Sequence, residues 1–332
     1  MRNKLIVVLI FAVTIVAGIS SYMGRDWAAR AMEKGPFVTE IIAVPLSLSR
    51  EDKSLASVGE LAFVAGWALA SESEDFGGWS AMVLGKDAKS LVALNDKGDW
   101  LEAELTLEAD RPLAGGLLYP FEQGARWATK SDYDAESLVR IGDGYLVGME
   151  QDHRILAVDG VGGANRLSAH NDLVDLSVLS SNGGLEAITV LPSGKLMLFA
   201  ERGLDQKATL PVWIVGEKHA DIRRFMPPKN YSPTDAATLP NGDILLLVRH
   251  YSQLDGVSVK ILHLTAEEIG GGETLVGTEL AHLADPLSVD NMEALDIEVL
   301  EDGRVRLYMM SDDNFNPLQR TLLMIFDWQR TN

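Results

Sequence analysis

Acidic residues stand at matching places in a phrase that the sequence repeats about every fifty residues. In each copy a polar or acidic residue opens one short apolar run, and a charged residue ends the next. The copies run from Ser80 to Asp96, Glu136 to Glu150, Glu186 to Glu201, Asp235 to Arg249 and Glu293 to Asp312. Carboxylates that share one site repel each other, so they need a cation, shared protons or a guanidinium beside them. If the fold gathers these residues, they suit cation binding and acid–base catalysis.

Oxygen ligands in a chain without cysteine favour Ca²⁺, or Mg²⁺ and Mn²⁺, over a metal that prefers thiolates. Three consecutive oxygen donors make one corner the best candidate for the metal, and two ring glutamates complete the predicted ligand set: Asp312, Asp313, Asn314, Glu201 and Glu293. The histidines show no paired spacing such as HExxH. His263 lies within an apolar run and is expected to be structural.

The remaining residues of the phrase receive catalytic and substrate-binding roles. Glu136 or Glu186 would act as the general base, with a pKa raised by like-charged neighbours. The planar guanidinium of Arg249 suits an oxyanion or a phosphate group. Expected substrate contacts are Ser80, Asp96, Asp235 and His250. An alternative stays open, because carboxylates at strand ends can also accept backbone N–H groups of a neighbouring sheet and simply hold the sheets together.

Tight turns separate the two apolar runs of each copy. They contain Gly, Pro, Asn or Asp, which are typical of β-hairpins, and they lie at 142–144, 192–194, 240–242 and 301–303. The flanking runs, such as 196–200 and 244–248, are almost continuously apolar. Continuous apolar character predicts strands that are covered on both faces.

Further strand-like sequence follows the hairpins, at 154–158, 212–215, 259–264 and 322–327. Two inner and two outer strands make a four-stranded blade, so we predict an all-β fold, a β-propeller of five or six blades. The last unit lacks a fourth strand, and residues 60–69 are a suitable donor from the other end of the chain. Residues 37–70 could instead contribute to a sixth, degenerate blade. In such a fold the charged ends of the phrase meet at one mouth of the central channel.

The first residues look like an export signal. Arg2 and Lys4 precede an uncharged apolar stretch, which is typical of a signal peptide, although residues 5–24 are also just long enough for an uncleaved membrane anchor. We therefore divide the chain into a signal or anchor at 1–24, a linker at 25–36 and a propeller domain at 37–332. The expected location is periplasmic or secreted, with attachment to the inner membrane if the segment is retained.

Composition narrows the range of partners. The formal net charge of −19 disfavours nucleic acid, because such a surface repels phosphate backbones. A chain of 332 residues with 47% hydrophobic content can bury a large core. We expect a monomer that meets a small-molecule ester or an envelope ligand, and membrane contact only through residues 5–24.

Common catalytic motifs are missing from the sequence. The nearest approach to GxSxG, Gly78 to Met82, lacks the final glycine, which disfavours a serine hydrolase. There is also no P-loop, and no GxGxxG between a strand and a helix.

Several phrases, taken in order, resemble the phytase-like family of exported bacterial proteins, also described as "esterase-like activity of phytase". They are FGGWSAM (76–82), ALNDKGDW (93–100), DAESL (134–138), GGLEAI (183–188), TDAATLPNGDILLLVRHYS (234–252), DNMEAL (290–295) and SDDNFNPLQRTLLMIF (311–326). The resemblance covers roughly residues 60–328. It implies a β-propeller outside the cytoplasm that hydrolyses esters, phosphate monoesters among them. Trp79, Ala81 and Lys97 depart from the family's usual residues, and Lys97 replaces an arginine that would favour anion binding.

Three functional hypotheses follow. The first is a periplasmic propeller hydrolase that acts on a phosphate or other ester with the help of a cation. The second is a non-catalytic envelope propeller that binds a ligand or a protein, with the charged ring acting as a latch. The third is lactone hydrolysis, which would use the same ring beneath a more apolar mouth.

Overall fold

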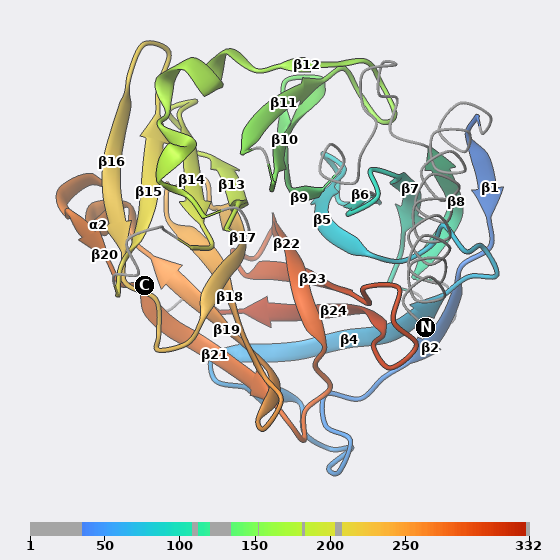
Figure 1. Ribbon diagram of the computed structural model, residues 1–332. Helices are drawn as coiled ribbons and strands as arrows, with labels where there is room; N and C mark the ends of the chain where they lie inside the picture. The colour runs from blue at the N-terminus through green and yellow to red at the C-terminus, as the bar shows by residue number, and fades with distance from the viewer. Residues whose placement is uncertain are drawn as a thin grey trace, which may run out of the picture.

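Five β-sheets stand around a central axis as the blades of a propeller (Figure 1). The protein is described by a computed structural model over residues 35–107, 112–119, 134–151, 153–180, 183–202 and 208–329. Within each blade the strands follow one another from the axis outward, and the innermost strands contact one another in a closed ring. The all-β propeller predicted from the repeats is therefore confirmed, with five blades.

The blades are numbered here in chain order. Blade 1 contains β5 (Trp79–Leu84), β6 (Ser90–Asn95), β7 (Trp100–Leu105), β8 (Leu113–Tyr119) and β1 (Phe37–Thr39). Blade 2 contains β9 (Ala135–Ile141), β10 (Gly144–Met149), β11 (Arg154–Val158) and β12 (Asn165–Leu167). Blade 3 contains β13 (Leu185–Val190), β14 (Leu196–Ala200), β15 (Leu210–Val215), β16 (Ala220–Phe225) and β20 (Thr274–Leu275). Blade 4 contains β17 (Ser232–Thr238), β18 (Ile244–Ser252), β19 (Gly256–Leu264) and β21 (Thr278–Ala284). Blade 5 contains β22 (Asn291–Val299), β23 (Val305–Asp312), β24 (Thr321–Trp328), β4 (Leu61–Ala70) and β2 (Ile42–Pro45), with β3 (Ser57–Val58) beside β4.

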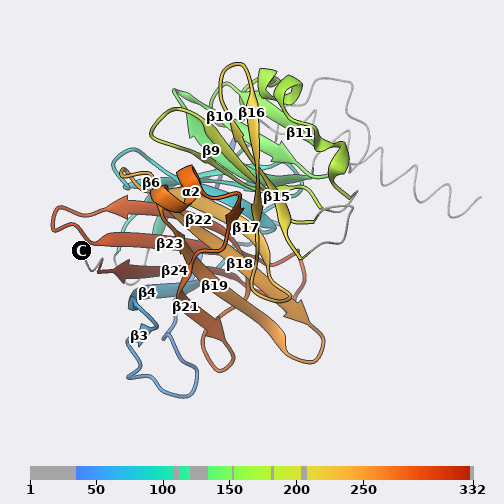
Figure 2. The same ribbon diagram turned by 90° about the vertical axis from the view of Figure 1, so that its left-hand side faces the viewer.

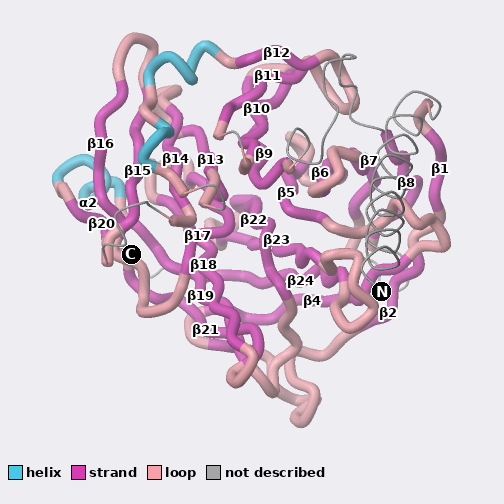
Figure 3. The backbone as a smooth tube through the Cα atoms, viewed as in Figure 1, coloured by secondary structure: helices cyan, strands magenta, loops and turns pink. Residues whose placement is uncertain are grey.

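Short helices lie at the periphery (Figure 3), namely η2 (Ala169–Leu173), η3 (Leu176–Val178) and α2 (Ala266–Gly271). Across the described ranges, none of the helices has the length and apolar character needed to cross a membrane. The signal or anchor predicted for residues 1–24 lies outside the described residues, as does the predicted linker up to residue 34.

A strand from the N-terminal part of the chain closes the propeller. β4 pairs antiparallel with β24, from Leu69 opposite Thr321 to Leu61 opposite Trp328. Figure 2 shows β22, β23, β24 and β4 side by side in blade 5. The closing strand predicted at residues 60–69 is thus confirmed. Residues 37–70 form no sixth blade, because their strands join blades 1 and 5.

The core consists of apolar layers between neighbouring blades, and each blade interface has its own layer. In β14, Met197 and Phe199 pack toward blade 4, whereas Leu196 and Leu198 pack toward blade 2. The alternation of side chains along a strand sends successive residues to opposite faces. Because both faces are covered, every residue of β14 must be apolar, which explains the continuous runs in the sequence.

Polar latches join the innermost strands across the blade interfaces. Asp235, which is 3% exposed, accepts hydrogen bonds from the backbone N–H groups of Leu295 in β22 (2.7 Å) and of Ala236 (2.8 Å). Ser137 donates to the carbonyl of Leu185 in the next blade (2.6 Å). Burial raises the pKa of Asp235 well above its usual range, and its backbone hydrogen bonds oppose that rise. Both oxygens of Asp235 thus accept backbone N–H groups, as the latch alternative expects, although the sequence assigned this residue to the substrate.

Removal of the Asp235 latch should destabilise the fold. We expect Asp235→Ala to lower the free energy of unfolding by about 1 to 3 kcal/mol, because it leaves the buried N–H of Leu295 without an acceptor. Asp235→Asn keeps an acceptor and should retain most of this stability. Asp143→Ala, at the fully exposed turn between β9 and β10, is the control. Denaturant unfolding measures the difference, and an Asp235→Ala protein as stable as the control would contradict the latch.

Candidate functional site

A β-bulge recurs in all five innermost strands at the same mouth of the channel. At each bulge the pairing register skips one residue of the innermost strand, and the skipped residues are Ser80, Glu136, Glu186, Thr234 and Glu293. Bulges re-aim a side chain and end regular pairing. The second strand of each blade ends beside the bulge of the innermost strand. The residues at or near these strand ends complete a polar ring, and they are Asp96, Glu150, Glu201, Arg249 and Asp312. The repeated phrase of the sequence therefore lies at one mouth, as the propeller predicts.

Blade 4 departs from the predicted alignment by one residue. Thr234, and not Asp235, occupies the bulge of β17, and its hydroxyl donates to the carbonyl of Met292 (3.2 Å). Asp235 takes the following position, which Ser137 occupies in β9, and both residues latch to the next blade. The sequence could not show this shift, because Thr and Asp are both polar and stand side by side.

Four carboxylates of the ring, with the adjacent Asp134, form what we call the acidic arc: Asp134, Glu136, Glu150, Glu186 and Glu201. It contains two groups of three, one of Asp134, Glu136 and Glu150 and one of Glu150, Glu186 and Glu201. In each group the oxygens lie within 4.8 Å of one another. Two oxygens that both bind one Ca²⁺ at about 2.3 to 2.6 Å are at most about 5 Å apart. Either group can therefore contribute three ligands to one cation, and Glu150 belongs to both.

The electrostatics of the acidic arc oppose full ionisation. Burial raises the pKa of Glu136 well above its usual range, and the charges of Glu186 and Glu293 add to the rise. Burial likewise raises the pKa of Glu186, with further contributions from Glu201, Glu293 and Glu150. Glu136 nevertheless keeps a partly exposed side chain. Near neutral pH the arc must hold protons or bind a cation.

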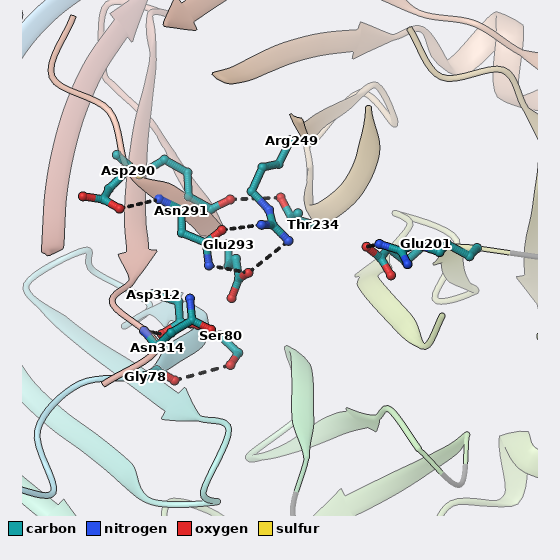
Figure 4. Close-up of polar contacts among 12 residues, drawn as sticks. Gly78, Ser80, Glu201, Thr234, Arg249, Asp290, Asn291, Glu293, Asp312 and Asn314 are labelled. Carbon is teal, nitrogen blue, oxygen red and sulfur yellow. Dashed lines mark hydrogen bonds and ion pairs between the residues drawn. The ribbon is translucent and has the colours of Figure 1, made fainter. Parts of the chain in front are cut away.

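Arg249, in β18 of blade 4, points toward Asn291 and Glu293 of blade 5 (Figure 4). Its guanidinium donates to the side-chain oxygen of Asn291 and lies 3.3 Å from a carboxylate oxygen of Glu293, which also accepts from Asn291 (2.8 Å). Burial raises the pKa of Glu293, although Arg249 opposes that rise. Burial and the nearby Glu293 raise the pKa of Asp312 to about 9, so this carboxyl holds a proton at neutral pH. The arginine side is therefore largely compensated within the protein.

The predicted metal corner at residues 312–314 serves mainly to anchor a loop. Asp313 accepts backbone N–H groups of Gly78 (2.9 Å) and Phe315 (3.0 Å) and the hydroxyl of Thr321 (3.0 Å). A side chain at Gly77 would approach the Asp313 carboxylate to 2.8 Å, and one at Gly78 would meet the Phe315 ring, which together explain the paired glycines of FGG. Asn314 donates its backbone N–H to Asp312 (2.6 Å). A metal at this corner stays a prediction, and in the described residues both three-carboxylate groups lie elsewhere.

The predicted substrate contacts fall in different places. Ser80 lies in the ring and donates to the carbonyl of Gly78 (3.4 Å), and Asp96 lies close enough to Asp312 to raise its pKa. His250 lies outside the ring, where its Nδ1 is 2.9 Å from the carbonyl oxygen of Asn230. The ammonium of Lys97 lies over the Phe315 ring, 2.8 Å from its centroid, so this substitution for arginine packs against the anchored loop.

Asp134, Thr234 and Asn291 were not predicted as site residues, and Glu150 was placed in the ring without a role. A signal for Glu150 exists in the sequence, since it ends its copy of the phrase where Glu201 ends the next. Gly184 gives a second one. A side chain there would approach Cγ of Glu150 to 2.9 Å, so the glycine of GGLEAI lets blades 2 and 3 bring their carboxylates together.

The comparison with protein families decides the relationship. The profile described as "Phytase-like: Esterase-like activity of phytase" matches residues 74–315, most of the chain. The chain belongs to the phytase-like family. The matched region contains the whole acidic arc and Arg249, so the site described above lies inside the family domain of this phytase-like propeller.

Solved structures of other proteins resemble the phytase-like chain at low identity. An endo-arabinase from Bacteroides thetaiotaomicron is 10% identical, with a TM-score of 0.49 over 78% of this chain and 96% of the arabinase. A glutaminyl cyclase from Myxococcus xanthus is 12% identical, with a TM-score of 0.45 over 81% of this chain and 97% of the cyclase. No curated protein matches the sequence. These likenesses leave the activity of the phytase-like propeller to be argued from its own site.

The raised pKa values predict an unusual dependence of stability on pH. A carboxyl whose pKa is raised in the folded state stabilises the fold when protonated, and this contribution is lost as the pH rises through the folded pKa. With a chelator present, the melting temperature should therefore fall as the pH rises toward about 9, because the unfolded chain has already ionised Asp312 while the folded protein keeps it protonated up to about that pH. Added Ca²⁺ should raise it most at the upper end. Thermal unfolding measures both, and a melting temperature that rises with pH under chelation would contradict the account.

Proposed function

We propose that this phytase-like propeller is an exported, cation-dependent ester hydrolase whose reaction takes place at the channel mouth, between the acidic arc and Arg249. One observation supports this most strongly. Two groups of three carboxylates share Glu150 in blades 2 and 3, and the guanidinium of Arg249 stands at the same mouth, in blade 4. Together they offer a cation site and an anion-binding group at the same opening.

The group of Glu150, Glu186 and Glu201 is our first choice for the cation ligands. Glu186 and Glu201 are 7% and 9% exposed, so a cation there would be held away from bulk water. A bound divalent cation supplies Lewis acidity and neutralises charge on the substrate. The group of Asp134, Glu136 and Glu150 is the second place for it, and Gln151 orients Asp134 by donating to its carboxylate (2.8 Å).

Arg249 would orient the substrate. Its side chain is 24% exposed, while Asn291 and Glu293 hold the guanidinium plane in place. A guanidinium fixed in this way can meet an anionic oxygen with little loss of conformational freedom. The ester's phosphoryl or carbonyl oxygen would therefore face Arg249, and the opposite face of the ester would turn toward the acidic arc.

Two carboxyl groups would move the protons. Glu136, partly exposed and with a raised pKa, would accept a proton from the attacking water. Asp312, which holds a proton at neutral pH, would donate it to the leaving alkoxide. Water thus adds to the phosphorus or carbon atom, the ester bond breaks, and a second proton transfer returns both carboxyls to their starting states.

A second candidate is an envelope propeller that binds a ligand without catalysis. It is favoured by two structural carboxylates. Asp235 accepts backbone N–H groups with both oxygens, and Asp313 accepts the backbone N–H of Gly78 with one oxygen and the hydroxyl of Thr321 with the other. In this case the cation would serve only to hold blades 2 and 3 together. The two candidates differ in the assay that follows.

Hydrolysis should require both the cation and Glu150. We expect the purified protein to hydrolyse para-nitrophenyl phosphate, phytate or para-nitrophenyl butyrate with Ca²⁺, and to lose this activity on chelation. Glu150→Gln removes a ligand common to both groups and should lower activity at limiting Ca²⁺ by about 10- to 100-fold. Glu217→Gln, an exposed residue at the other end of blade 3, is the matched control. Absence of turnover on all three esters with and without Ca²⁺ would refute the hydrolase and favour the second candidate.

A further inference from the structure

A cavity of about 530 Å³ opens beside the acidic arc, over blade 3. Its walls come from the end of β14, the start of β15 and the segment between β16 and β17. All three lie at the same end of the blade as Glu201, which lines the cavity and also belongs to a candidate cation group. The cavity is therefore a side pocket of the channel mouth, and its volume is typical of small-molecule sites, about 300 to 1,000 Å³.

The lining of this pocket differs from the rest of the mouth. Leu210, Met226, Pro227 and Pro228 give it an apolar wall. Its charged residues besides Glu201 are two cations, Arg202 and Lys229, both exposed, and Nη2 of Arg202 lies 3.2 Å from the carboxylate of Glu201. The chain has a formal net charge of −19, so two basic side chains at one pocket contrast with the acidic character of the protein as a whole.

The pocket wall formed by the segment between β16 and β17 is held by contacts with β18, β19 and β21. The hydroxyl of Tyr231 lies within hydrogen-bonding distance of Oγ of Ser258 (2.8 Å) and Nε2 of His282 (3.0 Å), and His250 contacts the carbonyl of Asn230 (2.9 Å). Two consecutive prolines stiffen the same segment. A wall that is rigid before the ligand arrives loses little entropy on binding. His250 is thus a positioning residue for the pocket, not a member of the ring.

We propose that this pocket binds the part of the substrate remote from the ester bond, and that this part is a compact organic group with its own anionic end, a carboxylate or a phosphate. The proposal rests on the proposed function, because Glu201 links the pocket to the cation site. The apolar wall covers the carbon frame of the group, while Lys229 and Arg202 pair with its charge. The pocket therefore selects doubly functional esters, with one end at the ring and one anion over blade 3.

Binding in the pocket can be tested without turnover. Met226, which is 44% exposed, lines the pocket, so the methyl signal of labelled methionine, assigned with Met226→Leu, reports on it directly. With Ca²⁺ present, benzoate should shift this signal saturably, and Lys229→Gln should weaken the apparent affinity by about fivefold. Lys218→Gln, an exposed residue at the other end of blade 3, should change nothing. The proposal is overturned if benzoate causes no saturable shift, if benzyl alcohol binds equally well, or if Lys229→Gln has no effect.

Kinetics then test the role in catalysis. Lys229→Gln should raise KM for para-carboxyphenyl phosphate about fivefold more than it raises KM for para-nitrophenyl phosphate, with a similar kcat. If the protein prefers carboxylic esters, the matched pair is mono-para-nitrophenyl glutarate and para-nitrophenyl butyrate. Equal changes for both members of a pair would overturn the selectivity while leaving the hydrolase intact. Absence of all turnover would refute the hydrolase, and the methyl signal would still decide the ligand class of the pocket.

Discussion

Repulsion among the carboxylates at one channel mouth is the constraint on which the rest of this site depends. Burial and like charge raise the pKa values of Glu136 and Glu186 together, so the arc cannot ionise fully without compensation. Arg249 compensates Glu293 between blades 4 and 5, and a proton compensates Asp312. Arg249 lowers the pKa of Glu186, and Arg202 and Arg249 lower that of Glu201, but burial still raises both values in the arc of blades 2 and 3. A divalent cation is the simplest group that would balance it.

The propeller tolerates the repulsion among these carboxylates because other interactions stabilise the fold. Apolar layers at every blade interface and the pairing of β4 with β24 hold the ring closed, independently of the polar mouth. Latches such as Ser137 and Asp235 then fix one innermost strand against the next, directly beside the bulges. The innermost strands thus pack through apolar side chains along most of their length and present polar side chains to the channel mouth at one end.

The repeats predicted most of the fold because each strand is marked by the order of apolar and turn residues within a short stretch of sequence. Turn residues and continuous apolar runs marked the hairpins, and the short last unit indicated a closing strand near residues 60–69, which is β4. The site was less predictable. Thr234 replaces Asp235 at the bulge because bulge register depends on pairing between strands, which sequence spacing does not reveal. The sequence assigned Asp313 to the metal by its residue type, whereas its oxygens accept hydrogen bonds from Gly78 and Thr321, and the contact with Gly78 joins segments far apart in the sequence.

The central claim is that a divalent cation binds at Glu150, between blades 2 and 3. The most direct measurement is the anomalous diffraction of crystals grown with Mn²⁺, collected near the metal's absorption edge. The account predicts one strong peak within about 2.5 Å of carboxylate oxygens from Glu150 and its partners in one of the two groups. A mouth without any peak, or a peak held only by residues 312–314, would contradict it.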